Sequence, residues 1–273
     1  MQGRQLPPMA MEQLTFFEDA SSALLTSSLV SAPELNAAFF QSYDSIISTF
    51  SGGKDSIAQT LTIIESGAPL EKIELWHHLI DGREGSEFMD WPCTEGYCRA
   101  FAQAIGVPLY ASWKKGGFEG ELLRKNKPTA TNYFETPSAL QSSGGCGPNG
   151  TRERFPQVSA DLSVRWCSAY LKIDVAAAAL RNQDRFLGKR VLFLTGERAS
   201  ESPGRAKYRP FEPHRTDLRH GKHYQRHVDH LRPIHWKYGR KPPRVPRAEE
   251  CRTIPSLHQA SFLRHCIRFP FVA

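Results

Sequence analysis

The residues with the clearest chemical potential form a short glycine-rich stretch. Residues 51–56 read Ser-Gly-Gly-Lys-Asp-Ser, between the apolar run 45–50 and the helical pattern 56–67. Glycines let the backbone turn tightly, and successive N–H groups at a helix N-terminus attract an anion. Lys54 adds positive charge, whereas Asp55 repels phosphate and suits a helix cap or a Mg²⁺ ligand. The stretch therefore predicts a phosphate-binding loop.

The loop differs from those of the common nucleotide-binding families. The P-loop requires G-x-x-x-x-G-K-[ST], but Ser48 stands five positions before Gly53, and Asp55 follows Lys54. A dinucleotide-binding G-x-G-x-x-G is also absent from the sequence. The stretch therefore indicates a phosphate loop of another class.

The loop resembles the S-G-G-x-D-S loop of the ATP pyrophosphatases and of their relatives, the phosphoadenosine phosphosulfate (PAPS) reductases. Residues 195–206 (TGERASESPGRA) are similar to the T-G-x-R-x-x-E-S-x-x-R block of the reductases. Residues 165–172 (RWCSAYLK) are similar to their R-x-C-x-x-x-L-K block, and Asp81-Gly82 stands where their second strand ends near the nucleotide. The resemblance covers roughly residues 35–236.

The resemblance implies a site for ATP or PAPS that acts at the α-phosphate, with Mg²⁺ bound through Asp55. Arg198 and Arg205 follow the apolar run 190–196, so we expect them beyond the carboxyl end of a strand, where open parallel sheets bind ligands. Together with Lys54 and Asp55, these arginines would act on the reacting phosphate. The nucleotide would be bound by Ser51, Gly52, Gly53, Lys54, Asp55, Ser56, Asp81, Gly82, Arg165, Lys172, Gly196, Glu197, Glu201 and Ser202.

The six cysteines contain no CxxC pair, which argues against a zinc ribbon or a thioredoxin-type pair. Cys167 lies between Arg165 and Lys172 and is either a nucleophilic thiol or a packing residue. An iron–sulfur cluster on four cysteines is a less favoured alternative. The reductases carry a catalytic Cys within Glu-Cys-Gly-Leu-His, and neither Cys251 nor Cys266 has that context. Adenylation with pyrophosphate release is therefore favoured over sulfite formation.

Positive charge is concentrated in one segment. The chain has a net charge of +7, but residues 203–247 hold 13 Lys or Arg against three Asp or Glu, a net charge of +10. This asymmetry predicts a surface for DNA or tRNA, with a merely solvated surface as the alternative. The histidines of 214–235 fit one face of a helix only in part, so a polyanion surface is favoured over a metal cluster. The predicted polyanion contacts are Arg215, Arg219, Lys222 and Arg226.

Apolar runs alternate with helical patterns along the chain. This alternation predicts βαβ crossovers and an α/β fold, a three-layer, doubly wound and mainly parallel sheet of about five strands. Residues 114–165 are predicted to be a long loop. We expect a loosely structured lead-in over 1–32, a nucleotide-binding domain over 33–240 and an irregular basic tail over 241–273. The predicted strands are 45–50, 72–80, 107–113 and 190–196, and the main predicted helices are 56–67, 95–106 and 167–183.

Three functions fit these features. The first is an adenine-nucleotide α-hydrolase that adenylates a substrate, in sulfur transfer or nucleic-acid modification, with a sulfur-donor protein as a candidate partner. The second is a PAPS or APS reductase, and the third is a nucleotide- or nucleic-acid-binding module without turnover. No apolar run reaches the ~18–20 residues that span a bilayer. The sequence therefore predicts a cytoplasmic protein without a membrane partner.

Overall fold

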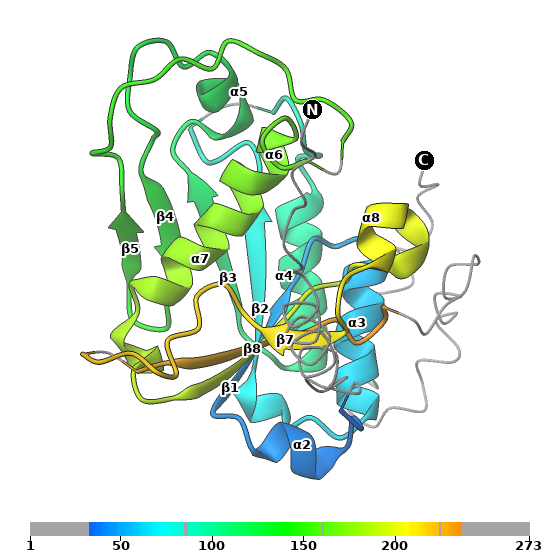
Figure 1. The fold of residues 1–273 in the computed structure, drawn as a ribbon. Coiled ribbons are helices and arrows are strands. Elements are labelled where there is room, and N and C mark those ends of the chain that lie inside the picture. Colours follow the sequence, from blue (N-terminus) through cyan, green and yellow to red (C-terminus); the bar gives the residue numbers. More distant parts are fainter. Residues whose placement is uncertain (1–32, 85–86, 160, 224, 236–273) are drawn as a thin grey trace, which may run out of the picture. The chain divides into compact units, whose positions relative to one another are not determined.

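The computed structural model describes most of the chain between residues 33 and 235 (Figure 1). Its internal contacts divide the chain into Met1–Pro33 and Glu34–Ala273, and the fold below belongs to the second unit. The predicted lead-in and basic tail lie outside the described residues, so both stay predictions. The described ranges are 33–84, 87–159, 161–223 and 225–235.

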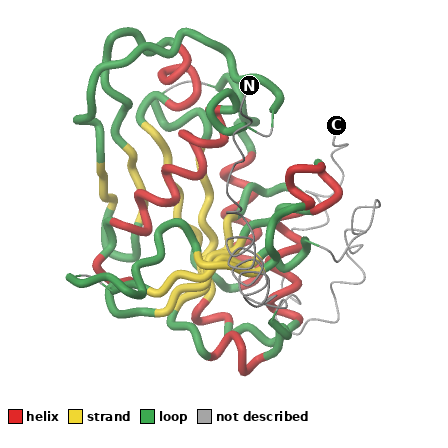
Figure 2. The backbone as a smooth tube through the Cα atoms, in the orientation of Figure 1, coloured by secondary structure: helices red, strands yellow, loops and turns green. Residues whose placement is uncertain are grey.

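A mixed sheet forms the centre of the fold (Figure 2). Its strands over the described ranges are β1 (Ser45–Thr49), β2 (Ile73–Leu79), β3 (Leu109–Lys114), β4 (Asn132–Glu135), β5 (Leu140–Ser143), β6 (Arg190–Leu194), β7 (Phe211–Pro213) and β8 (His227–Leu231). The strand order is β5-β4-β3-β2-β1-β6-β8-β7. Strands β3, β2, β1, β6 and β8 pair in parallel, and β4, β5 and β7 join through antiparallel pairs. The prediction of a mainly parallel α/β sheet is confirmed.

Helices pack on both faces of the sheet, as Figure 1 shows for α7 and for α3 with α4. Ile46 of β1 lies in one core with Ile63 and Ile105, whereas its neighbour Ile47 lies in another core with Leu180. No helix of the described ranges is long and apolar enough to cross a bilayer. The helical elements are α2 (Ala37–Gln41), α3 (Lys54–Glu65), η1 (Leu70–Lys72), α4 (Thr94–Ile105), α5 (Gly117–Leu122), α6 (Trp166–Ser168), η2 (Ala169–Ile173), α7 (Asp174–Arg181), η3 (Asp184–Phe186), η4 (Ala199–Glu201) and α8 (Pro203–Ala206).

The predicted strand–loop–helix unit around the glycine-rich stretch is confirmed. β1 is an interior strand of the sheet, and residues 50–53 connect it to α3. The helix begins at Lys54, two residues before the predicted start at Ser56. Lys54 and Asp55 therefore belong to the first helical turn, where backbone N–H groups have no intrahelical acceptor.

Two segments differ from the prediction. Residues 114–165 are not only loop, because they contain α5 and the antiparallel strands β4 and β5. These strands have four residues each and β5 is largely polar, so neither shows a periodic pattern long enough to recognise. The histidine run is not helical at residues 227–231, because parallel pairing with β6 makes this stretch strand β8, in which Val228 and Leu231 are buried.

Several histidines are held neutral inside the fold. Burial lowers the pKa of His77, His78, His214 and His230, and that of His214 falls to about 4. The ring of His214 lies 4.6 Å from the ring of Phe193, and its Nδ1 is 2.8 Å from Thr216 Oγ1. Protonation of such a ring costs free energy that the unfolded chain does not incur.

We predict that stability falls as the pH drops from about 6.5 towards 4, because the unfolded chain binds protons there that the folded chain does not. Each such histidine should contribute about 1.4 kcal/mol per pH unit to the free energy of unfolding. Urea unfolding across this range should show the loss, with little change between about pH 7 and 8. The variant His214→Asn, which keeps an acceptor for Thr216, should reduce the slope; an unchanged slope would contradict the prediction.

Candidate functional site

The candidate site lies where the strand order of the sheet reverses. From β1 the chain adds β2 and β3 on one side, and later adds β6 and β8 on the other side. In open α/β sheets, ligands bind beyond the carboxyl ends of the strands at such a point. Residues 51–56 follow β1 and residues 195–202 follow β6, so the two predicted segments meet there.

The backbone of the glycine-rich loop turns at Gly52, whose φ is +77°. Gly53 is the N-cap residue of α3, and no side chain caps this helix. Ser56 is buried and its hydroxyl donates to Gly53 O over 2.8 Å, so it braces the turn. Ser51 and Lys54 are exposed. The uncapped first N–H groups of α3, together with Lys54, form an electropositive end that suits an anion.

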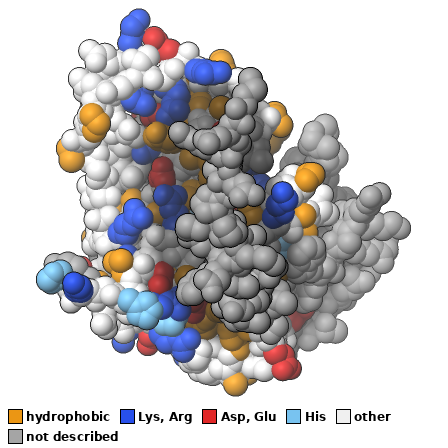
Figure 3. Space-filling view, viewed as in Figure 1, with side chains coloured by type: hydrophobic (Ala, Val, Ile, Leu, Met, Phe, Trp, Pro, Cys, Tyr) orange, Lys and Arg blue, Asp and Glu red, His pale blue; other side chains and the backbone are white. Residues whose placement is uncertain are grey.

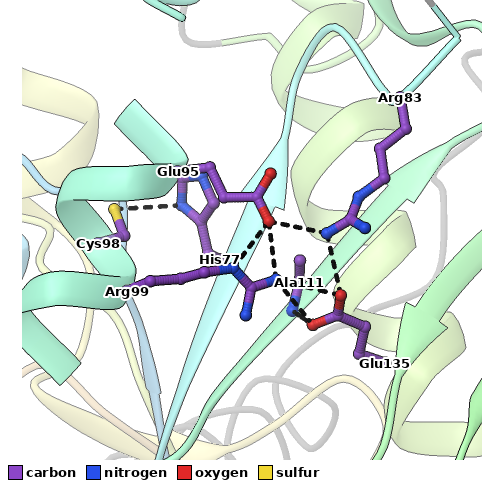
Figure 4. Close-up of polar contacts among 7 residues, drawn as sticks. All are labelled: His77, Arg83, Glu95, Cys98, Arg99, Ala111 and Glu135. Carbon is purple, nitrogen blue, oxygen red and sulfur yellow. Dashed lines mark hydrogen bonds and ion pairs between the residues drawn. The ribbon is translucent and has the colours of Figure 1, made fainter. Parts of the chain in front are cut away.

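Side chains of α4 and β2, namely Tyr97, Cys98 and His77, pack next to the glycine-rich loop. A Cβ atom on Gly52 would lie 3.1 Å from Cys98 Sγ and 3.2 Å from Tyr97 Cδ1. Figure 4 shows Cys98 facing His77, whose Nδ1 lies 2.8 Å from Phe50 O and 3.7 Å from the sulfur. Burial raises the pKa of the Cys98 thiol to about 12, so it packs as a neutral group. Sequence reasoning missed this support, which is built from three separate elements.

A network of charged side chains lies beside this support (Figure 4). Arg83 follows β2, and its Nη2 contacts Glu95 Oε1 of α4 at 2.7 Å and Glu135 Oε1 of β4 at 2.9 Å. Arg99 contacts the same two carboxylates. These side chains are partly exposed, so each pair adds little to stability, but together they link α4 to strand β4.

The T-G-E-R block, which is residues 195–198, contacts the glycine-rich loop directly. Arg198 Nε lies 3.0 Å from Asp55 Oδ1, although neither atom makes an aligned hydrogen bond. Glu201 lies 3.7 Å from Arg198 and also pairs with Arg205. A Cβ atom on Gly196 would lie 3.1 Å from Asp55 O, so the block needs glycine for this close approach. The structure thus brings four of the predicted residues into one chain of opposite charges.

Asp81 serves the loop that follows β2. It is buried, and its Oδ2 accepts hydrogen bonds from Met89 N at 2.7 Å and from Asp90 N at 2.8 Å. Its Oδ1 is buried and has no hydrogen-bond partner among the described residues. Gly82 turns with a φ of +72°. One acceptor atom of Asp81 is therefore still available at the carboxyl end of β2.

The R-x-C-x-x-x-L-K block lies next to α5. Trp166 stacks on Phe118 with ring centroids 5.0 Å apart, and the half-buried Cys167 packs against the same group of residues. Arg165 Nε is buried without a partner, and Lys172 is exposed. Within the described ranges, no hydrogen bond or ion pair joins this block to residues 51–56. Cys167 is a free, half-buried thiol that contributes to this packing, and its role as a nucleophile stays a prediction.

The described residues hold no group of three or more His, Cys, Asp or Glu side chains that could bind a metal ion. Cys93, Cys98, Cys146 and Cys167 are free thiols, and Cys251 and Cys266 lie outside the described ranges. Mg²⁺ that arrives with a nucleotide needs only one or two protein carboxylates. Asp55, with a buried oxygen that accepts no hydrogen bond, fits that requirement.

The predicted polyanion contacts have different surroundings. Arg226 is 2% exposed and donates to Leu180 O and Thr216 O, so its assignment as a polyanion contact was wrong. Arg219 is paired with Asp217 and Asp229, and Arg215 is paired with Asp174. Lys222 is exposed. On the face drawn in Figure 3, the visible basic side chains of the described residues are scattered among acidic ones.

No family model matches the chain, and no curated protein sequence matches it. Function is therefore inferred from the chemistry of the site. That chemistry consists of an uncapped helix N-terminus after a glycine turn, an Asp55–Arg198 pair and a second arginine held by Glu201.

The two loop glycines provide a matched test. Gly52→Ala should lower the free energy of unfolding by about 1–2 kcal/mol, because alanine disfavours a positive φ and its Cβ would crowd Cys98. Gly53→Ala should be tolerated, since Gly53 has a φ of −76° and its Cβ would lie 3.5 Å from Ser51 Oγ. The conformation that requires glycine therefore lies at Gly52 and not at Gly53. Urea unfolding of both variants measures the difference, and equal stabilities would refute it.

A second pair of variants tests the corrected role of the basic segment. Arg226→Ala should destabilise the fold by about 3 kcal/mol, because it leaves two buried carbonyl groups without a donor. Lys222→Ala should leave stability unchanged. Thermal unfolding and the salt dependence of binding to single-stranded and duplex DNA would be measured for both. A stable Arg226→Ala variant with reduced DNA binding would restore the original assignment.

Proposed function

We propose that this protein binds an adenine nucleotide in the crevice between β1 and β6 and transfers the adenylyl group to an acceptor, with release of pyrophosphate. The observation that carries the proposal is the contact between Asp55 of the glycine-rich loop and Arg198 of the T-G-E-R block. Two segments that are far apart in the sequence, each similar to a block of one nucleotide-binding family, meet at one point.

The fold supports the same proposal. The sheet reverses its strand order at β1, and helices pack on both of its faces. This arrangement fits the three-layer, doubly wound sheet of the adenine nucleotide α-hydrolases. In such folds the loop after the central strand binds phosphate, and that loop here carries the S-G-G-x-D-S residues.

The charges of the site suggest how a nucleotide would be accepted. Without a ligand, Asp55 and Glu201 neutralise Arg198 and Arg205. A phosphate group would compete for the arginines, because forked hydrogen bonds to phosphate are strong. Arg198 would then move from Asp55 to the nucleotide, and the carboxylate of Asp55 would become available to the Mg²⁺ that accompanies the phosphates.

Adenylyl transfer needs few protein groups. A nucleophilic atom of the acceptor attacks the α-phosphorus, the bond to the bridging oxygen breaks, and pyrophosphate leaves with its electron pair. Arg198, Arg205 and the N–H groups at the start of α3 would stabilise the negative charge on that leaving group. Mg²⁺, when bound, supplies further neutralisation of the same charge. Lys54, exposed at the first helical position, would attract the incoming phosphates.

Adenylation is favoured over PAPS reduction because neither Cys251 nor Cys266 has the Glu-Cys-Gly-Leu-His context of the reductases. A reductase needs a thiolate nucleophile. Of the described thiols, burial raises the pKa of Cys98 to about 12, and Cys167 packs against the cluster of Phe118, Leu122, Trp166 and Leu171. A sulfur-transfer or nucleic-acid modification reaction, with a separate sulfur-donor protein, is the setting that we propose.

Incubation with ATP–Mg²⁺ and with PAPS, followed by assays for pyrophosphate, AMP and sulfite, tests the proposal. We expect pyrophosphate from ATP and no sulfite from PAPS. Asp55→Asn and Arg198→Met should each lower pyrophosphate release by about 100-fold, the usual effect of removing one group that stabilises the transition state. Arg185→Met, which removes an ion pair with Glu74 at the opposite end of the strands, is the matched control. Sulfite formation would favour the reductase, and ATP binding without turnover would favour a binding module.

A further inference from the structure

The loop that carries Arg198 is held from one side by the chain that leaves β8. Thr195 N donates to Leu231 O over 3.2 Å, and Ala199 N donates to His235 O over 3.1 Å. Thr195 Oγ1 also lies 2.8 Å from His230 Nε2. Residues 230–235 therefore follow the T-G-E-R block along its length, on the side away from the glycine-rich loop.

One buried arginine is the centre of this support. Arg232 is 7% exposed, and its Nε donates to Glu197 Oε2 over 2.7 Å. Its Nη1 donates to Glu212 Oε1 over 2.7 Å and to Arg209 O over 2.6 Å. Its guanidinium also lies over the ring of Tyr208, 4.9 Å from the centroid. A planar guanidinium with several fixed donors can hold such a geometry, whereas a lysine can supply only a point charge.

Glu197 connects this support to the site, because it directly precedes Arg198 in the chain. Its Oε2 accepts from both Arg232 and Thr195 Oγ1. We propose that Arg232 is a positioning residue: by holding Glu197 on the β8 side of the loop, it directs the next residue, Arg198, towards Asp55 and the phosphate-binding loop.

The charges of the region give this role a second consequence. Three carboxylates, those of Asp55, Glu197 and Glu201, lie within three residues of Arg198 along the chain or in contact with it. Arg232 binds the carboxylate of Glu197, and among the described residues Asp55 and Glu201 are the carboxylates that pair with Arg198. Without Arg232, the carboxylate of Glu197 would lack its partner and compete for the same guanidinium. Removing the charge of Glu197 should then relieve part of the damage caused by removing Arg232.

The inference also explains part of the charge asymmetry of the chain. Arg232 belongs to the strongly basic segment 203–247, yet its charge is used inside the fold, between Glu197 and Glu212. The proposed role of Arg232 rests on the proposed function only for the turnover measurements, because the placement of residues 195–201 can be measured without a nucleotide.

The test uses the full chain and the variants Arg232→Met, Arg232→Lys, Glu197→Gln and the double variant Arg232→Met with Glu197→Gln. Arg185→Met is the matched control, because it also removes a partly buried arginine–carboxylate pair, at the opposite end of the sheet. Hydrogen exchange measured by mass spectrometry reports the opening of residues 195–201 and of β1. Pyrophosphate release from ATP–Mg²⁺ gives kcat and KM for each variant.

We expect Arg232→Met to speed exchange in residues 195–201 by at least about ten-fold and to leave β1 unchanged. In turnover, kcat should fall by about ten- to a hundred-fold with little change in KM, because a misplaced Arg198 affects the transition state more than nucleotide binding. Arg232→Lys should recover part of this loss. The double variant should turn over faster than Arg232→Met alone.

Three results would overturn the role of Arg232. The first is that residues 195–201 of Arg232→Met exchange at the wild-type rate, and the second is that exchange in this variant is also faster throughout the sheet. The third is a double variant that is no more active than Arg232→Met. If the wild-type protein releases no pyrophosphate from ATP, the proposed function fails, and the exchange data alone decide the role of Arg232. The two failures are therefore distinguishable.

Discussion

The parallel pairing of β1 with β2 on one side and with β6 on the other is the constraint from which the site follows. Because β1 has partners on both sides, its chain must leave the sheet at the carboxyl end and enter a helix on one face. The register that pairs Ile47 with Phe193 makes β1 and β6 end side by side. Asp55 and Arg198, each a few residues beyond its strand, are thereby brought to 3.0 Å.

A small polar network fixes α3 to β1. Gln59 Nε2 donates to Ser48 Oγ over 3.0 Å and to Thr49 O over 2.5 Å, while Ser48 Oγ and Thr60 Oγ1 lie 2.9 Å apart. Ser48, Gln59 and Thr60 are fully buried, and only Gln59 Oε1 of this network has no hydrogen-bond partner among the described residues. Buried hydrogen bonds of this kind favour a single arrangement. The start of α3 is therefore held in a defined position relative to the strand, as a phosphate site requires.

Within the described part of the basic segment, four of the eight Lys and Arg side chains pair with carboxylates, namely Arg205, Arg215, Arg219 and Arg232. Arg219 is shared by Asp217 and Asp229, and Arg232 is shared by Glu197 and Glu212. A large share of the positive charge thus supports the fold instead of facing an external polyanion. The same principle operates at the site, where carboxylates neutralise the arginines until a stronger anion replaces them.

The sequence by itself determined the elements with a long periodic pattern. The strand–glycine loop–helix unit at residues 45–65 and the helix that ends at Gly106 could be predicted, because neighbouring residues encode their apolar period and their turns. Only the tertiary structure decided the short strands β4, β5, β7 and β8, the burial of Arg226 and the partners of Arg232. These features depend on residues far apart in the chain that meet only once the sheet register is set, and a charged side chain looks the same in a sequence whether it faces water or a buried carboxylate.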